Sequence, residues 1–281
     1  MTGGAQTIGV IGTGRVARAL AGALGPGVAL WGRSPEALEG ACAATRGLAM
    51  ASPVALLDAC DTVLIAVADA ALPQVVAQLA AQPTPHRPLV AHVSGASGIA
   101  VLKPLHGADI AAIHPVMTFT GDPVAEAARM AGARFAITGA DAVAEARART
   151  LVARLGGIAV PVAEAQRALY HAGLSHAANH LVTLIAGAGQ ILSAAGISDP
   201  GAMLAPLVRA ALENSLAAGF AALSGPVLRD DRATVAAHLA ALARDCPDAL
   251  PAYRAMAQAT AATLARDGRD NTAIRALLDT A

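Results

Sequence analysis

A glycine-rich turn near the amino end of the chain has the spacing of a dinucleotide-binding loop. The residues Gly12-Thr13-Gly14-Arg15-Val16-Ala17 follow an apolar segment and open a segment of helical character. In such a GxGxxG/A turn the first glycine permits a tight turn, and the second lets the backbone approach a pyrophosphate. The free N–H groups at the helix start then face the phosphates. The pattern predicts a dinucleotide site, although an ordinary strand-to-helix turn can share its composition.

The residues after the second predicted strand, Arg33 and Ser34, bear on the choice between NAD and NADP. An NAD site usually places an acidic side chain here for the ribose 2′-hydroxyl, whereas an NADP site often places an arginine. The Arg33 guanidinium can fork onto a 2′-phosphate, and the Ser34 hydroxyl can donate a further hydrogen bond. No carboxylate occurs between Leu30 and Pro35. We therefore expect NADP; the alternative is that Arg33 is a solvated surface residue.

Further candidate site residues follow the fourth and fifth predicted strands. Val67, Ala68 and Asp69 follow the fourth, and Ser94 follows the fifth. Ligands of open α/β sheets bind beyond the carboxyl ends of the strands, so Val67, Ala68 and Ser94 are expected at the cofactor site. Ser94 is the best placed to approach the nicotinamide or the substrate. The alternatives are that Asp69 caps the next helix and that Ser94 serves only in a turn.

Histidines are the candidate proton donors, because an imidazole with a pKa of about 6.5 suits proton transfer near neutrality. His114 follows the sixth predicted strand, and His171, Ser175 and Asn179 recur every four residues on a long predicted helix. This spacing gives a polar stripe on one helix face. We predict His171 as the general acid, His114 as a second candidate, and Asn179 as the group that orients the substrate oxygen or the nicotinamide amide. The alternative is that the histidines are buried and satisfied by the backbone or a partner.

A loop marked by Gly225-Pro226 carries Arg229, which can bind a substrate carboxylate through two hydrogen bonds. We predict that Arg229 holds an anionic end of the substrate. The alternative is an ion pair between Arg229 and Asp231. Asp231 is itself expected to cap the helix that carries His238.

The sequence favours no metal site. His176 and His180 have the spacing of two ligands on one helix face, but no HExxH pattern and no third ligand are evident. Cys42, Cys60 and Cys246 are odd in number, far apart and without CxxC spacing. They indicate a protein of a reducing compartment.

The elements that must position these residues alternate between strands and helices in the first half of the chain. Several predicted strands are continuous apolar runs, as in parallel strands buried on both faces. The predicted strands are 7–11, 28–31, 48–51, 62–67, 89–93, 110–113, 135–138 and 158–161, and the helices between them are 15–24, 35–45, 53–59, 72–81 and 140–155. This alternation predicts a doubly wound α/β domain of the Rossmann type.

The second half has helical periodicity and almost no β-branched runs. Helices are predicted at 164–195, 201–223, 231–243, 250–266 and 271–278, with breakers between them at Asp199-Pro200, Gly225-Pro226 and Cys246-Pro247. We therefore expect an α/β Rossmann domain over residues 1–162, followed by an all-α substrate and dimerisation domain over residues 163–281.

Composition excludes several partners. The 281 residues include 20 Lys+Arg and 20 Asp+Glu, so no net field attracts nucleic acid or an anionic membrane. Aromatic residues make up only 2% of the chain, which disfavours base-stacking surfaces. The longest uncharged stretch, 168–198, is interrupted by histidines and other polar residues, and no signal peptide is evident at the start. We expect a soluble, cytoplasmic protein that binds a small molecule.

The chain resembles the 6-phosphogluconate dehydrogenase-like reductases, which include β-hydroxyacid dehydrogenases, pyrroline-5-carboxylate reductase, ketopantoate reductase and deazaflavin-dependent NADP reductase. It is more similar to the Rossmann-like family whose C-terminal part is domain of unknown function 2520. The segments that carry this likeness are 114–119, 170–172 with Asn179, Asn214, and 225–238 with Arg229, Asp231 and His238. The resemblance implies an NADP-type oxidoreductase that is dimeric through its helical domain. The substrates of the family are largely undefined.

Two positions depart from the patterns of these relatives. The β-hydroxyacid dehydrogenases carry a catalytic lysine three residues before an asparagine, whereas this chain has His176 before Asn179. The lysine-dependent mechanism is therefore not transferred. Asp230 stands where the related loop is expected to have glycine.

Together these features predict an NADP-dependent oxidoreductase that acts on a small carbonyl or imine compound, in the manner of a ketopantoate reductase or an imine reductase. Whether a deazaflavin replaces the organic substrate as hydride partner stays open. The alternative is a non-catalytic NADP-binding sensor or assembly protein, which the absent lysine would suit.

Overall fold

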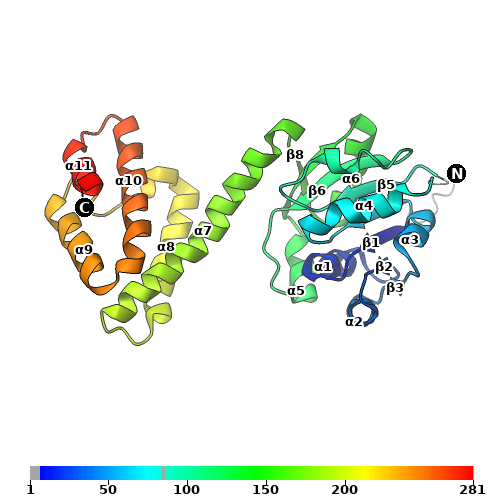
Figure 1. The fold of residues 1–281 in the computed structure, drawn as a ribbon, viewed down its shortest axis with the longest axis horizontal. Coiled ribbons are helices and arrows are strands. Elements are labelled where there is room, and N and C mark those ends of the chain that lie inside the picture. Colours follow the sequence, from blue (N-terminus) through cyan, green and yellow to red (C-terminus); the bar gives the residue numbers. More distant parts are fainter. Residues whose placement is uncertain (1–6, 84–85, 281) are drawn as a thin grey trace. The chain divides into compact units, whose positions relative to one another are not determined.

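The computed structural model describes residues 7–83 and 86–280. The chain divides into two compact units, Met1–Leu174 and Ser175–Ala281. Helix α7 (Arg167–Ala194) runs from the first unit into the second (Figure 1). The domain boundary predicted near residue 162 lies just before this helix.

The first unit is built on one eight-stranded sheet with the order β3-β2-β1-β4-β5-β6-β7-β8. Neighbouring strands are parallel except for β6 and β7, which are antiparallel. The strands are β1 (Ile8–Ile11), β2 (Ala29–Trp31), β3 (Leu48–Ala49), β4 (Thr62–Ile65), β5 (Leu89–His92), β6 (Asp109–Pro115), β7 (Arg134–Gly139) and β8 (Ile158–Pro161). All eight predicted strands form, and the α/β class with an all-helical second part is confirmed.

Alternating side chains of the sheet supply two separate cores. In β4, Leu64 packs in one core, while Val63 and Ile65 pack in the other, as the two-residue period of a strand requires. The first core is covered by α1 (Arg15–Leu24), α2 (Pro35–Thr45), α5 (Pro123–Met130) and α6 (Ala142–Arg154), and the second by α3 (Pro53–Ala59), α4 (Leu72–Ala80) and the 3₁₀ helix Ile99–Leu102. The helices cover both faces of the sheet, so it is buried on both sides.

Helix α5 was not among the predicted helices, and the signals for it are local. Asp122 accepts hydrogen bonds from the N–H groups of Val124 and Ala125, and Pro123 stands at the first helical position. An Asp cap followed by proline is a common helix start. The helix has only eight residues, and its apolar anchor is the buried Met130. A short helix with one large anchor gives little periodicity to detect.

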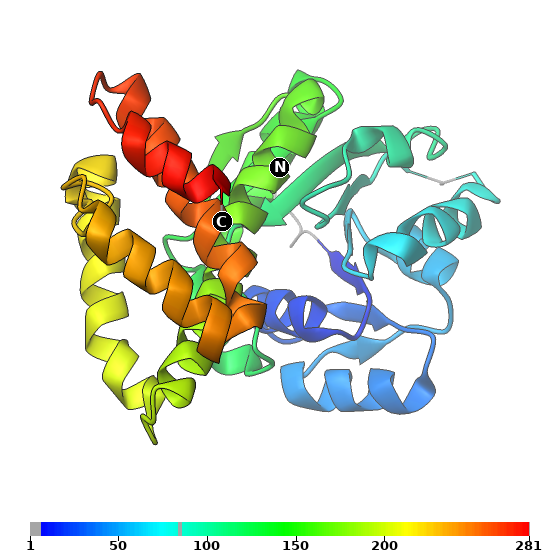
Figure 2. The same ribbon diagram turned by 60° about the vertical axis from the view of Figure 1, so that its left-hand side comes forward.

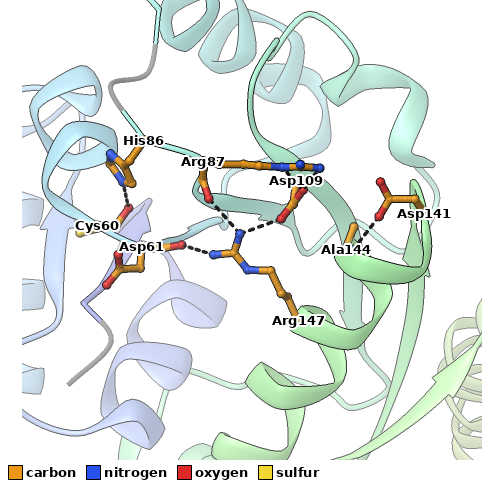
Figure 3. Close-up of polar contacts among 8 residues, drawn as sticks. All are labelled: Cys60, Asp61, His86, Arg87, Asp109, Asp141, Ala144 and Arg147. Atoms are coloured by element: carbon orange, nitrogen blue, oxygen red, sulfur yellow. Dashed lines mark hydrogen bonds and ion pairs between the residues drawn. The ribbon is translucent and has the colours of Figure 1, made fainter. Parts of the chain in front are cut away.

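A charged clamp ties together the amino ends of the central strands (Figure 3). The buried Asp109 carboxylate at the start of β6 pairs with Arg87 at 2.6 Å and with Arg147 of α6 at 2.8 Å. Arg147 also donates to the backbone carbonyls of Arg87 and Asp61, at 2.9 and 2.8 Å, and these residues precede β5 and β4. One guanidinium therefore joins three strands to one helix. This clamp lies at the sheet edge opposite to the carboxyl ends, where ligands of such sheets bind.

The second unit is helical. It contains most of α7, α8 (Pro200–Ala218), α9 (Arg232–Asp245), α10 (Leu250–Arg266) and α11 (Thr272–Thr280). Helices α9, α10 and α11 pack together around a small core, as Figures 1 and 2 show. Its buried members are Val235, Leu239, Ala257, Ala261, Ile274 and Leu278. No described helix has the length and apolarity needed to cross a membrane.

The predicted helices of the second half form with small changes at their ends. The long helix begins with a 3₁₀ turn at Glu164–Gln166, and the helix predicted over 201–223 ends in another at Gly219–Ala222. Asp231 caps α9 as predicted, because its carboxylate accepts from the N–H of Thr234 at 3.1 Å and from its hydroxyl at 2.7 Å. Asp230 adopts a φ of 52°, which is the left-handed conformation that glycine favours. Asp230 therefore occupies a backbone conformation that glycine adopts more readily.

Candidate functional site

The fold itself requires glycine at position 12. Gly12 follows β1 with a φ of 131°, and a Cβ there would lie 2.1 Å from the carbonyl oxygen of Ala66. Its N–H donates to the carbonyl of Trp31 at 2.7 Å. Gly12 therefore places the turn after β1 close to the ends of the neighbouring strands β2 and β4.

Gly14 has no such requirement. It is the N-cap of α1 with an ordinary φ of −70°, and a Cβ there would meet no atom within 4 Å. The open space above Gly14 is therefore available for a ligand to approach the backbone. Helix α1 begins at Arg15, with no acidic residue in its first turn and no side-chain cap. The first N–H groups and the helix dipole thus favour an anion here.

A cavity of about 290 Å³ adjoins this turn. It is lined by residues 12–14, 31–34, 66–68, Ala71, Gln74, Val75 and Gln78. Arg33 is exposed and forms no ion pair with the described residues, and no carboxylate lines the cavity. The site therefore offers a cation with no competing anion. Gln74 and Gln78 were not predicted, although their spacing of four residues on the helix after the fourth strand could have identified them.

Most of the predicted cofactor residues meet at this cavity. Thr13, Gly14, Arg33, Val67 and Ala68 all line it. Ser34 lines it too, and its Oγ accepts from the N–H of Ala37 at 3.2 Å as the cap of α2. This leaves the hydroxyl hydrogen of Ser34 available to donate to a ligand. Arg15 and Val16 lie in the first turn of α1 and are not among the lining residues.

The alternative interpretation of Asp69 as a helix cap is wrong. Asp69 is the first residue of the 3₁₀ helix Asp69–Ala71, and the capping residue, Ala68, has no side-chain hydrogen bond to offer. Helix α4 then begins directly at Leu72 with Pro73 in its first turn. The proline takes the position where an N–H would need a cap.

A second cluster gathers around the carboxyl ends of β5 and β6 and the start of α7. The Nδ1 atom of His114 and the hydroxyl oxygen of Tyr170 share a hydrogen bond of 2.8 Å. The ring centres of His114 and His171 lie 6.3 Å apart with nearly perpendicular planes. A Cβ on Gly95 would come within 2.7 Å of His171 and 2.9 Å of His114. Glycine after Ser94 is therefore what lets both rings approach this loop.

Arg167 is a buried member of this cluster that the sequence did not predict. Its side chain is 2% exposed, and its two terminal nitrogens donate to the Thr138 hydroxyl and the Ser94 carbonyl, both at 3.0 Å. Its guanidinium lies 5.9 Å from the centre of the Tyr170 ring. Among the described residues Arg167 has no ion-pair partner, and its Nε has no hydrogen-bond partner. A buried positive charge therefore stands beside the histidines.

These surroundings keep His114 neutral. Burial is the largest cause that lowers the pKa of His114 to about 4, and the nearby Arg167 and His171 contribute to the same shift. Burial also raises the pKa of Tyr170, so its hydroxyl stays protonated at neutral pH. At pH 7 His114 and Tyr170 thus form a neutral hydrogen-bonded pair. This arrangement suits His114 better to orient Tyr170 than to donate a proton itself.

Ser94 is held from two sides. Its N–H donates to Nδ1 of the buried His92 at 3.2 Å, and its Oγ accepts from the N–H of Ser97 at 3.0 Å. The Nε2 of His92 is bonded to the carbonyl of Gly98 at 2.9 Å. Three hydrogen bonds therefore hold the loop after β5 in place, and they do not use the hydroxyl hydrogen of Ser94.

Two predicted catalytic residues belong to the second unit. Asn179 is exposed on α7, and Arg229 is exposed in the loop before α9. Among the described residues Arg229 and Asp231 form no ion pair. The roles predicted for Asn179 and Arg229 stay predictions.

His176 and His180 also lie on α7, with their Nδ1 atoms 2.9 Å apart. Within the described part of the chain, no group of three potential metal-ligating side chains forms.

Comparison with known proteins adds a family assignment. The sequence matches a Rossmann-like domain over residues 3–115 and Domain of unknown function (DUF2520) over residues 133–260. The chain combines a Rossmann-like domain with a DUF2520 domain. No curated protein matches the sequence.

Solved structures share this fold at low identity. A protein from Bacteroides fragilis described as a candidate NADP oxidoreductase has a TM-score of 0.74 at 18% identity, over 91% of this chain and 98% of that one. A Thermotoga maritima protein has a TM-score of 0.70 at 18% identity, over 94% and 100%. An imine reductase from Myxococcus stipitatus in complex with NADP⁺ has a TM-score of 0.63 at 17% identity, over 92% and 93%.

The histidine cluster combines residues from both domains. Ser94 and His114 lie in the Rossmann-like match, while Thr138, Arg167, Tyr170 and His171 lie in the DUF2520 match. The DUF2520 domain therefore begins inside the sheet, with β7, and supplies the buried charge and the phenol of the cluster. A site of this kind is expected only where the two domains occur together.

The low pKa of His114 predicts how the protein responds to acid. Because the folded-state pKa of about 4 lies below the unfolded value of about 6.5, His114 contributes stability above pH 6.5 that is lost as the pH falls toward 4. The free energy of unfolding should fall by roughly 2–3 kcal/mol over this range on account of His114. Denaturant unfolding at a series of pH values, compared between the wild type and His114→Gln, measures the difference.

His92, whose pKa is also lowered by burial, contributes in the same direction in both proteins, so the comparison isolates His114. An NMR titration of the His114 ring with a midpoint near 6.5 would contradict this prediction.

Proposed function

We propose that this protein is an NADP-dependent oxidoreductase that transfers hydride between NADP(H) and a small carbonyl or imine compound. The observation that carries the proposal is the open space above Gly14, next to a cavity with Arg33 and no carboxylate. The similarity in fold to NADP-binding oxidoreductases supports it. The family to which the DUF2520 domain belongs leaves the substrate undefined.

The residues at the cavity fit NADP(H). The N–H groups at the start of α1 would hold the pyrophosphate, and Arg33 with Ser34 would hold the 2′-phosphate. Gln74 and Gln78 also line the cavity and offer amide groups. When bound, the cofactor supplies the hydride, and the protein must supply position and a proton.

We assign the proton transfer that accompanies hydride transfer to the cluster around His114. We assign proton donation to His171, and we assign to the neutral His114–Tyr170 pair the task of orienting the substrate heteroatom through the phenol. The buried charge of Arg167 would stabilise negative charge that develops on that atom, because charge interactions are stronger away from water. Asn179 would orient the substrate or the nicotinamide amide, and Arg229 would hold an anionic group.

The cofactor assignment predicts a change in specificity on substitution of Arg33. Arg33→Asp should weaken NADPH binding by about tenfold or more, because the 2′-phosphate loses its cation and meets a carboxylate. Binding of NADH should not weaken. Calorimetric titration of both cofactors measures this, with Arg46→Asp as the control, since Arg46 is also exposed but lies at the far end of α2.

An unchanged preference for NADPH in Arg33→Asp would contradict the specificity assignment. No binding of either nicotinamide cofactor by the wild type would contradict the oxidoreductase as a whole.

The proton assignment predicts a loss of turnover without a loss of cofactor. His171→Gln should lower kcat by about 10²–10⁴-fold on a substrate found in a panel of oxo acids and cyclic imines. Tyr170→Phe should lower kcat less and raise KM, because it removes an orienting group. Both variants should bind NADPH as the wild type does.

Full turnover in His171→Gln and in His114→Ala would overturn the assignment. Tight NADPH binding with no turnover on the panel would instead favour a non-catalytic NADP sensor.

We also propose that the protein is a homodimer through its second unit. Among the described residues of α8 none is buried, and Leu207 and Leu216 are 67% and 80% exposed. An apolar groove of about 400 Å³ runs between α7 and α8. An exposed apolar surface of this kind marks an interface.

The three unpaired thiols further suit a protein of the reducing cytoplasm.

The dimer predicts a response to charge on α8. The double variant Leu207→Glu and Leu216→Glu should sediment as a monomer, because burying two carboxylates in an apolar interface is unfavourable. Val143→Glu, at an exposed apolar position of the first unit, should leave the mass unchanged. A wild type that sediments as a monomer at micromolar concentration would exclude this proposal.

A further inference from the structure

The second unit contains a cavity that the proposed reduction does not use. Its volume is about 570 Å³, and its walls come from α7, the loop after α8, α9 and α10. This volume lies within the range of small-molecule sites, about 300–1,000 Å³. All of its lining residues lie between 183 and 260, so the cavity belongs to the second unit alone.

A hydrogen-bonded pair of side chains stands among the polar lining residues. Nδ1 of His238 and the hydroxyl oxygen of Tyr253 are 2.8 Å apart, and the two rings are nearly perpendicular. The pair also lines a neighbouring cavity of about 310 Å³. Tyr253 therefore presents its oxygen in a largely apolar recess, with His238 as its fixed partner.

The rest of the lining is mostly hydrocarbon. Leu184 and Ile191 of α7, Leu223 and Val227 of the loop, and Met256 of α10 line the cavity. A ligand must therefore bury an apolar body here. The polar lining residues besides His238 and Tyr253 are Thr183, Gln190, Ser224, Asp248 and Thr260.

The charges of the lining have one sign. Among the described residues that line the two cavities there is no lysine or arginine, while Asp248 lines the larger cavity and Asp245 the smaller one. Asp245 is paired with Arg244 at 2.6 Å. Asp248 has no ion-pair partner in the described part of the chain. The lining of the larger cavity thus includes an exposed carboxylate without an ion-pair partner and a phenol oxygen that can accept a hydrogen bond.

We propose that this cavity binds an apolar primary or secondary amine in its protonated form. The ammonium donates to the Asp248 carboxylate and to the oxygen of Tyr253, and the hydrocarbon body fills the space between α7 and α10. A carboxylate ligand is disfavoured because Asp248 repels it and no lysine or arginine in the described lining attracts it. This site does not depend on the proposed oxidoreductase activity, since its residues are separate from the cofactor cavity and the His114 cluster.

The experiment uses the full chain and three probes that differ in one group. Titration calorimetry at pH 7 compares 4-phenylbutylamine, 4-phenylbutanol and 4-phenylbutyrate. We expect the amine to bind about tenfold or more tightly than the alcohol, and the carboxylate not to bind. Asp248→Asn should lower the affinity for the amine about tenfold and leave that for the alcohol unchanged.

Matched variants separate the proposed contacts from general effects. Asp245→Asn removes a carboxylate of the neighbouring cavity and should change neither affinity. Tyr253→Phe should weaken the amine and the alcohol alike, because both use the phenol oxygen. Thermal unfolding of each variant establishes that it is folded.

Several outcomes would overturn the proposal. Binding of 4-phenylbutyrate as tight as that of the amine, or an unchanged amine affinity in Asp248→Asn, would exclude the charge-based selection. No heat with any probe, together with dissociation of the oligomer in Met256→Glu, would show that a second copy of the chain fills the cavity. Loss of NADPH binding plays no part in these outcomes, so failure here is distinct from failure of the oxidoreductase.

Discussion

The structure depends on the buried guanidinium of Arg167, which forms no ion pair among the described residues. Arg167 joins the loop after β5 to β7 through the Ser94 carbonyl and the Thr138 hydroxyl, and it does so from the first turn of α7. A charge in such a place is costly unless its hydrogen bonds are made, and here both partners are neutral oxygens. The positive potential that remains is what the neighbouring side chains experience. It adds to the effect of burial, the larger cause, in keeping His114 neutral, and it makes the surroundings of Tyr170 suited to negative charge.

Arginine side chains are ion-paired at one edge of the sheet and not at the other. At the amino ends, the guanidinium of Arg147 is paired with the Asp109 carboxylate and saturated by two backbone carbonyls. At the carboxyl ends, Arg15, Arg33 and Arg167 form no ion pairs among the described residues. The chain has no net charge, so this difference arises from placement alone. The edge that receives ligands in folds of this type therefore carries guanidinium groups without ion-pair partners, which suits an anionic dinucleotide.

What could be predicted from the sequence was local. The turn around Gly12 and Gly14, the end of β2 at Arg33 and the cap at Asp231 each depend on neighbours a few residues away, and each formed as expected. The bond between His114 and Tyr170 joins residues 56 positions apart. Its geometry depends on β7 returning antiparallel to β6, which no periodicity reveals. Arg167 was not predicted, because an arginine at a helix start is normally a surface residue.

The second unit leaves part of its apolar surface uncovered by its own residues. Its buried hydrophobic core lies among α9, α10 and α11, whereas α8 buries none of its described residues. Hydrophobic burial is the main favourable term in folding, so helices without it need another surface to cover them. The apolar groove between α7 and α8 and the cavity between α7 and α10 share Leu184 and Ala188, and their other lining residues differ. The groove is lined almost wholly by hydrocarbon, as a protein interface core is, while the cavity adds an unpaired carboxylate and a phenol. Such polar groups are unfavourable against a neighbouring helix but useful to a small ligand, so the two surfaces are suited to different occupants.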